Sequence, residues 1–96
     1  MPLIRIVKLT FAADKVSGFL QVFDERKEMI ASFEGCSSVE LLRDINNPNI
    51  FFTYSKWDKE QSLENYRNSE LFNTVWDTVK KWFAGKPEAW SLTNEW

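Results

Sequence analysis

The 96-residue sequence has no histidine and a single cysteine, Cys36. One cysteine cannot form an internal disulfide, and without histidine there is no cluster of the residues that usually hold zinc or iron. The three glycines are scattered at positions 18, 35 and 85, so there is no glycine-rich phosphate-binding loop. The sequence therefore predicts neither a metal site nor a bound cofactor.

An excess of charge of one sign is also lacking, because 12 basic residues nearly balance 14 acidic ones and the net charge at pH 7 is only −2. Nucleic-acid binding depends on a basic patch, so we expect no nucleic-acid partner. No stretch is apolar for the roughly 18 residues that a membrane span needs, and the first residues lack a signal-peptide pattern. With a lone, reduced cysteine, these features predict a cytoplasmic protein with no membrane partner.

Aromatic residues, in contrast, are abundant: five tryptophans and eight phenylalanines. A chain of this length forms one domain, here taken as residues 1–96, and buries only a modest core. Tryptophan is enriched where protein surfaces meet. We therefore expect the protein to associate with a second copy of itself as a homodimer.

Hydrophobic periodicity predicts the element order β-α-β-β-α-β, with the second helix broken in two. The expected strands are residues 3–11, 36–45, 50–57 and 89–96, and a four-residue turn of 46–49 joins the middle two. The first helix opens near Asp14 and has Gly35 as its C′ residue. Asp58 is expected to cap the next helical piece, and Asn68 or Ser69 the last one.

This order is the ferredoxin-like split βαβ pattern, an α+β sandwich with an antiparallel sheet. Helices cover one face of such a sheet and leave the other open. The strands 3–11 and 50–57 carry apolar residues on both sides, so their second face also needs a cover. Pairing two sheets face to face supplies it.

The segment 33–72 resembles the antibiotic biosynthesis monooxygenase family, small proteins that form dimeric α/β barrels. The resemblance rests on the order of a Gly35-Cys36 turn, a strand, an Asn47-Pro48 turn, a strand that ends at Trp57, and a helical segment 63–72. It implies a dimeric barrel. It also implies a cofactor-independent monooxygenase that acts on a small aromatic or quinol-like compound.

The sequence departs from the family at two places where many relatives carry histidine, which here hold Tyr66 and Leu71. In the haem-degrading members, the places of Tyr66 and Trp76 resemble a tryptophan and the haem-binding histidine. Tryptophan has no basic nitrogen and cannot ligate iron. Haem degradation of that type is therefore not expected.

Oxygenation without a cofactor needs an apolar cavity, a route for the substrate proton, and donors that hold the resulting oxyanion. From the resemblance and from strand parity, we predict Trp57, Arg43 and Tyr54 as catalytic residues. The predicted substrate-binding wall consists of Tyr66, Phe72 and Trp76. Arg43 shares its strand face with apolar neighbours, which favours an anion-holding role, and Glu40 or Asp44 is the expected base.

Each of these residues also has a structural interpretation. Trp57 could cap the core where strand meets helix, Trp76 could be a core aromatic, and Arg43 could be an edge charge whose stem packs on apolar neighbours. Cys36 has no histidine partner, so a small core residue is the stronger interpretation. The alternative function is a non-catalytic small-molecule-binding or structural dimeric module. Cavity volume separates the two, because small-molecule sites occupy about 300 Å³ or more.

Overall fold

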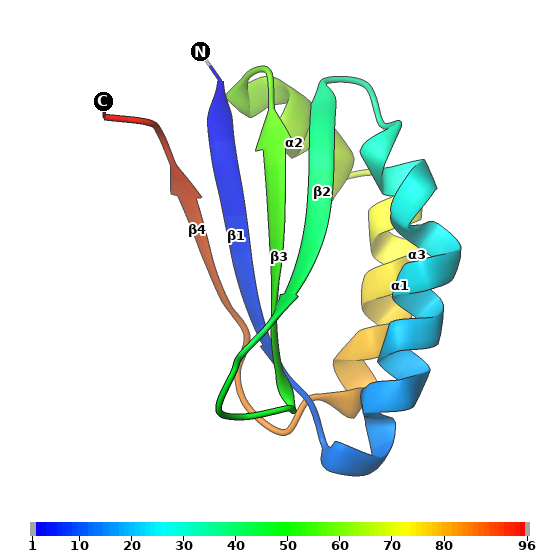
Figure 1. Ribbon diagram of the computed structural model, residues 1–96. Helices are drawn as coiled ribbons and strands as arrows, with labels where there is room; N and C mark the ends of the chain where they lie inside the picture. The colour runs from blue at the N-terminus through cyan, green and yellow to red at the C-terminus, as the bar shows by residue number, and fades with distance from the viewer. Residues whose placement is uncertain (1, 96) are drawn as a thin grey trace.

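The computed structural model describes residues 2–95, which form a four-stranded antiparallel sheet with helices on one face (Figure 1). The strand order is β2-β3-β1-β4, with bounds β1 (Leu3–Thr10), β2 (Cys36–Arg43), β3 (Ile50–Trp57) and β4 (Glu88–Leu92). The helices are α1 (Val16–Ala31), α2 (Glu60–Arg67) and α3 (Glu70–Val79), with 3₁₀ turns at Ala13–Lys15 and Lys80–Trp82. The predicted ferredoxin-like α+β fold is confirmed.

The core lies between the helices and the odd-numbered side chains of β1 and β3. Residues that pair directly across antiparallel strands share a face, and Leu9 pairs with Phe51 in this way. Phe11 and Phe19 stack above them with ring centroids 4.2 Å apart. Together with Val16 and Val79, these four residues form the buried cluster that fixes α1 and α3 on the sheet.

The turn between α1 and β2 depends on Gly35, but not in the predicted way. Helix α1 ends at Ala31 with Ser32 as its cap, so the prediction that Gly35 is the C′ residue is wrong. The Phe33 N–H donates to the Ile30 carbonyl at 3.1 Å, and this 3₁₀-type bond ends the helix early. Gly35 instead has φ +90°, and a Cβ there would overlap the Ser62 side chain. Only glycine allows this angle and this close approach.

The start of α2 differs from the prediction by one residue. The Asp58 N–H donates to the Gly35 carbonyl at 2.8 Å, which holds Asp58 in the turn that leaves β3. Lys59 is therefore the N-cap of α2, without a side-chain cap, and the prediction for Asp58 is wrong. The cap of α3 is confirmed at Ser69, whose Oγ accepts from the Phe72 N–H at 3.1 Å.

Three strands end earlier than the sequence predicts, and the first of them, β1, ends at Thr10 instead of residue 11. Strand β2 stops at Arg43, because the Asp44 carboxylate accepts from the N–H groups of Asn46 and Asn47 at 3.0 and 2.8 Å and begins the turn there. Strand β4 ends at Leu92 and pairs with β1 of the same chain. The predicted end of that strand, Trp96, lies outside the described residues.

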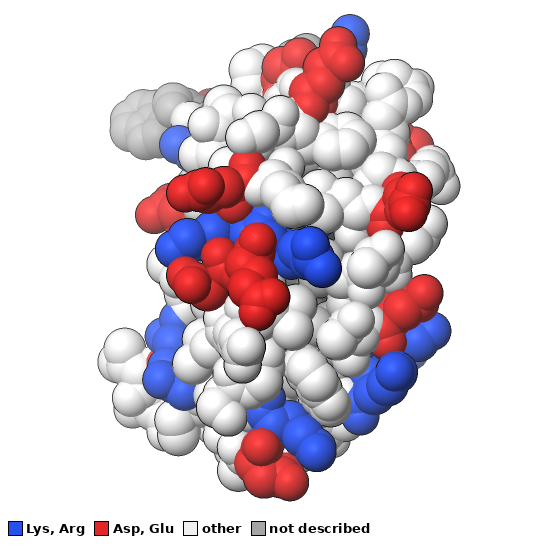
Figure 2. Space-filling view, turned by 90° about the vertical axis from the view of Figure 1, so that its right-hand side faces the viewer, with Lys and Arg blue, Asp and Glu red and all other residues white. Residues whose placement is uncertain are grey.

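The two sides of the molecule differ in polarity. On the side where the helices lie, acidic and basic side chains are interspersed with uncharged ones (Figure 2), as in the helix pairs Asp24–Lys27 and Asp77–Lys80. The opposite sheet face carries exposed apolar side chains beside a few charged ones such as Lys8 and Glu40, and no element of residues 2–95 covers it. Exposed fractions there are 41% for Trp90, 44% for Leu92 and 47% for Leu42. Among the described helices, none has the length and apolar character to span a membrane.

Candidate functional site

A cavity of about 380 Å³ lies between the sheet and the helices. Its floor consists of inward-facing residues of β1, β2 and β3, and its other walls come from all three helices and the start of β4. Most of the lining is apolar; its members include Val7, Leu9, Phe19, Phe23, Ile30, Val39, Leu63, Phe72, Val75, Trp76 and Val79. The cavity exceeds the about 300 Å³ typical of the smaller ligand sites.

The three residues predicted as a substrate-binding wall all line this cavity. Tyr66 comes from the end of α2, and Phe72 and Trp76 lie one turn apart on α3. The Tyr66 and Phe72 rings meet edge to face at 5.2 Å, and the Phe72 and Trp76 rings stack at 5.8 Å. The Ser69 hydroxyl links the two helices, because it donates to the Tyr66 carbonyl at 2.6 Å and accepts from the Phe72 N–H at 3.1 Å.

Tyr66 carries the phenol of this wall. Burial, with a smaller contribution from nearby Cys36, raises the pKa of Tyr66 to about 12. At neutral pH its hydroxyl therefore stays protonated. No hydrogen bond to another described residue occupies it, so Tyr66 can donate to a ligand oxygen but cannot act as a base.

Trp57 lies directly behind Tyr66 and outside the cavity lining. Its side chain is only 1% exposed, and its ring stacks on Tyr66 at 5.1 Å. The indole N–H donates to the Ser55 hydroxyl at 2.9 Å. Ser55 itself lines the cavity. Trp57 thus contacts the cavity wall through Tyr66 and Ser55, which is the core-capping position that the sequence also allowed.

Arg43 and Tyr54, the other two predicted catalytic residues, do not line the cavity. Arg43 is exposed at the end of β2, where its Nε donates to the Pro48 carbonyl at 2.9 Å and its guanidinium lies 4.7 Å from the Phe51 ring centre. Parity places Arg43 on the helix side, but beyond the end of the core. Tyr54 has even parity and lies on the opposite sheet face, beside Lys56.

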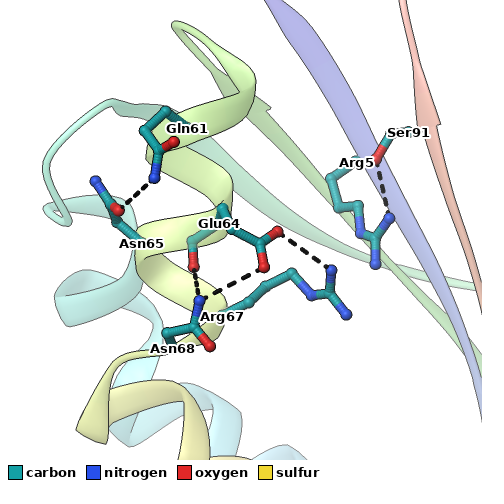
Figure 3. Close-up of polar contacts among 7 residues, drawn as sticks. All are labelled: Arg5, Gln61, Glu64, Asn65, Arg67, Asn68 and Ser91. Atoms are coloured by element: carbon teal, nitrogen blue, oxygen red, sulfur yellow. Dashed lines mark hydrogen bonds and ion pairs between the residues drawn. The ribbon is translucent and has the colours of Figure 1, made fainter.

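Two other arginines, which the sequence analysis did not single out, form a charged end of the cavity. Arg5 of β1 donates from Nη1 to the Ser91 hydroxyl of β4 at 2.9 Å, and Arg67 at the end of α2 pairs with Glu64 at 3.6 Å (Figure 3). Burial and then the positive charge of Arg67 lower the pKa of Arg5, while Glu64 raises it. The sequence feature that could have revealed Arg5 is its alternation with Val7 and Leu9 in β1, which puts the three side chains on the same sheet face.

Cys36 and the acidic residues complete the inventory of reactive groups. Burial raises the pKa of the Cys36 thiol, and its Sγ lies 3.5 Å from the Ser38 carbonyl, so it stays protonated. Among residues 2–95 there is no group of three or more metal-binding side chains of His, Cys, Asp or Glu. Glu88 lies at the rim of the cavity, but its carboxylate is on the opposite sheet face, where it pairs with Lys8 at 3.7 Å.

These features define a ferredoxin-like α+β domain with an aromatic-walled cavity for a small molecule. The model of the antibiotic biosynthesis monooxygenase family matches residues 2–77. The chain belongs to this family. Family membership favours an oxidoreductase of the monooxygenase type as its enzyme class.

Solved structures agree with this fold over almost the whole chain. A Methanosarcina mazei conserved protein has a TM-score of 0.93 at 19% identity and covers 99% of this chain and 94% of its own. A Nitrosomonas europaea protein, provisionally assigned as an antibiotic biosynthesis monooxygenase, has a TM-score of 0.92 at 18% identity. The match covers 99% of this chain and 91% of that protein. Rv0793 from Mycobacterium tuberculosis has a TM-score of 0.89 at 15% identity, and the match covers 98% of this chain and 95% of that protein. No curated protein matches the sequence.

Proposed function

We propose that this protein is a cofactor-independent monooxygenase that acts on a small aromatic or quinol-like compound. The observation that carries the proposal is the cavity of about 380 Å³. It is large enough for a small-molecule ligand, and its wall of Tyr66, Phe72 and Trp76 suits a planar aromatic ring. A cytoplasmic location, expected from the single reduced cysteine, is part of the proposal.

The chemistry follows from what the substrate itself supplies. An electron-rich substrate, once deprotonated, passes one electron to O₂, and the resulting radical and superoxide combine to form a peroxide. Loss of water from the peroxide leaves a carbonyl group. A CH₂ group and O₂ thus become C=O and H₂O, so the substrate carbon provides all the electrons and no further reductant is required.

The protein's contribution is to stabilise the oxyanion, while the substrate proton passes to water. Tyr66 lines the cavity and stays protonated at neutral pH, which supports its role as the hydrogen-bond donor to the substrate oxygen. Glu88 is not assigned as the base, because its carboxylate pairs with Lys8 on the open sheet face. The expected bases lie elsewhere: Glu40 is exposed on the opposite sheet face, and Asp44 begins the turn after β2.

We also propose that the protein works as a homodimer through the open face of its sheet. Trp90 and Leu92 of β4 and Leu42 of β2 are exposed on this face, and their neighbours Ile6 and Tyr54 extend the apolar surface between them. Large apolar patches of this kind usually mark an interface. Face-to-face pairing of two sheets would bury it.

The second candidate is a non-catalytic binding or structural module of the same fold. The observation that favours it is the substitution of both family histidines, where this chain has Tyr66 and Leu71. Without histidine, neither a base with a pKa near neutral nor a proton shuttle is available at those positions. A protein of this kind would bind an aromatic compound in the same cavity without oxidising it.

Oxygen uptake tests the proposal. The metal-free protein is supplied with anthrones, naphthols and hydroquinones in air-saturated buffer. We expect uptake above the buffer rate, a loss of roughly tenfold or more in Tyr66→Phe, and little change in the matched phenol control Tyr54→Phe. No uptake from any compound by a folded protein would overturn the monooxygenase and leave the binding module. An equal loss in both variants would overturn the role of Tyr66.

A further inference from the structure

We infer that the charged end of the cavity, Arg5 and Arg67, selects an aromatic substrate that carries an anionic oxygen group, either a carboxylate or a phenolate. This inference rests on the proposed function and deepens it by naming the substrate class. The ring would lie along the aromatic wall. The anionic group would lie between the two guanidinium groups.

The two arginines reach the cavity from different elements and meet at one end of it. Arg5 rises from the middle of the sheet, while Arg67 leaves the last turn of α2 toward the sheet edge formed by β1 and β4 (Figure 3). Both side chains line the cavity. A guanidinium group matches the planar geometry of a carboxylate and can bind it through two hydrogen bonds.

The local charge balance leaves room for an anion. Of the two guanidinium groups, Arg67 pairs with Glu64 at 3.6 Å, while Arg5 donates to the neutral hydroxyl of Ser91. Glu88 is offset by Lys8. The charged end therefore carries an excess of about one positive charge beside an apolar cavity, where a charge without a counter-ion is costly.

The half-buried position of Arg5 indicates why a bound anion would be stabilising. Burial and the neighbouring Arg67 both act against its charged form. An anion between the two guanidinium groups would reverse both effects, because it screens the like charges and supplies the missing counter-ion. The cost of placing Arg5 here is consistent with a ligand-binding role.

The arginines and the wall also define an orientation. Tyr66 and Arg67 are consecutive in α2, and both line the cavity. An anionic group held at the charged end would therefore place its attached ring against Tyr66 and Phe72. A phenolate held there would have its own oxygen at the arginines. A carboxylate would leave a separate ring carbon for oxidation.

Binding without oxygen tests the inference independently of turnover. The purified protein is titrated anaerobically with 2-naphthoate, with neutral 2-naphthamide and with 2-naphthol, following tryptophan fluorescence and calorimetry. We expect naphthoate to bind at least about tenfold more tightly than the amide, as charge-assisted hydrogen bonds imply. If the site takes phenolates, naphthol binds in its ionised form, which its absorption spectrum reports, and the preference for naphthoate over naphthol is smaller.

Variants of the arginines complete the test. Arg67→Gln and Arg5→Gln should each weaken anion binding by about tenfold and leave amide binding unchanged, while the control Arg43→Gln changes neither. Arg67 is exposed, so its variant remains informative if Arg5→Gln does not fold. Equal affinity for naphthoate, naphthamide and naphthol, or unchanged anion affinity in Arg67→Gln, would overturn the inference.

The inference and the proposed function fail separately. Anion-selective binding without oxygen uptake from any compound would support the charged end and overturn the monooxygenase. Oxygen uptake from neutral hydroquinones, with no preference for anions in the anaerobic titration, would support the monooxygenase and overturn the role of Arg5 and Arg67.

Discussion

The indole ring of Trp57 stacks on the phenol ring of Tyr66, with their centroids 5.1 Å apart and 29° between their planes. One ring is fully buried at the end of β3, and the other lines the cavity. The packing at the end of the sheet therefore sets the position of the phenol in the wall. A substitution of Trp57 should therefore change the position of the Tyr66 ring in the cavity.

Trp57→Phe should lower the free energy of unfolding by about 2 kcal/mol. The substitution removes the indole N–H bond to Ser55 and leaves unfilled space beside Tyr66. Urea denaturation of the wild type and the variant measures the loss.

A double-mutant cycle with Ser55→Ala isolates the hydrogen bond in that loss. Ser55→Ala alone leaves a buried indole N–H unpaired. The losses of unfolding free energy in the two single variants should therefore add up to about 1 kcal/mol more than the loss in the double variant. Strict additivity would show that the hydrogen bond does not contribute to stability.

The pH dependence of stability should change in Tyr66→Phe. The pKa of Tyr66 in the folded protein is raised to about 12 from the ordinary value of 10.0, mainly by burial. The folded state thus keeps a proton that the unfolded chain loses. The stabilisation is complete below pH 10 and is lost as the pH rises toward 12.

Urea unfolding at a series of pH values from about 8 to 11 checks this sign, because a tyrosine in the unfolded chain ionises near pH 10, as it does in a short peptide. The wild type should lose stability relative to Tyr66→Phe as the pH rises through 10. A constant difference between the two proteins over the whole series would contradict the raised pKa.

The proposed dimer predicts that a charge on the open sheet face separates the subunits. Trp90→Glu places a carboxylate on that face, at a residue 41% exposed in one chain. Sedimentation analysis should show a shift from dimer to monomer. Met29→Glu is the matched control, since Met29 is 46% exposed on α1 and lies away from the sheet face. A Trp90→Glu dimer as tight as the wild type would contradict the proposed interface.

Ser69→Ala should lower the free energy of unfolding by about 1 kcal/mol, because its hydroxyl caps α3 by accepting from the Phe72 N–H. Thermal unfolding followed by circular dichroism measures the effect. Asp58→Ala serves as the comparison: the sequence favours it as a cap, but α2 begins at Lys59 without a side-chain cap. A larger loss in Asp58→Ala than in Ser69→Ala would reverse this assignment.

The sequence predicted the fold well because periodicity acts over whole elements. Strand β3 has its predicted bounds, and α3 begins after Ser69, one of its two predicted caps. Element ends were less predictable, because single hydrogen bonds decide them. The Asp58 N–H bonded to Gly35 delays α2 by one residue, and the Asp44 carboxylate ends β2 early.

The candidate site was only partly predictable. Phe72 and Trp76 share the face of α3 toward the sheet, which their spacing reveals, and Tyr66 meets them from the end of α2. Arg43 and Arg5 both have the parity of the helix side, so parity alone does not separate them. What separates them is position along the strand: Arg5 pairs with Ser55 over the cavity, whereas Arg43 pairs with Phe51 at the end of the core.

The close contact between Gly35 and Ser62 has a consequence for how this fold can change its ligand. Any side chain at position 35 would force α2 to shift, since a Cβ there overlaps Ser62. Leu63, Tyr66 and Arg67 lie on the same helix and line the cavity, so they would shift with it. A substitution at position 35 can therefore change the shape of the cavity from outside, because Gly35 is not part of its lining.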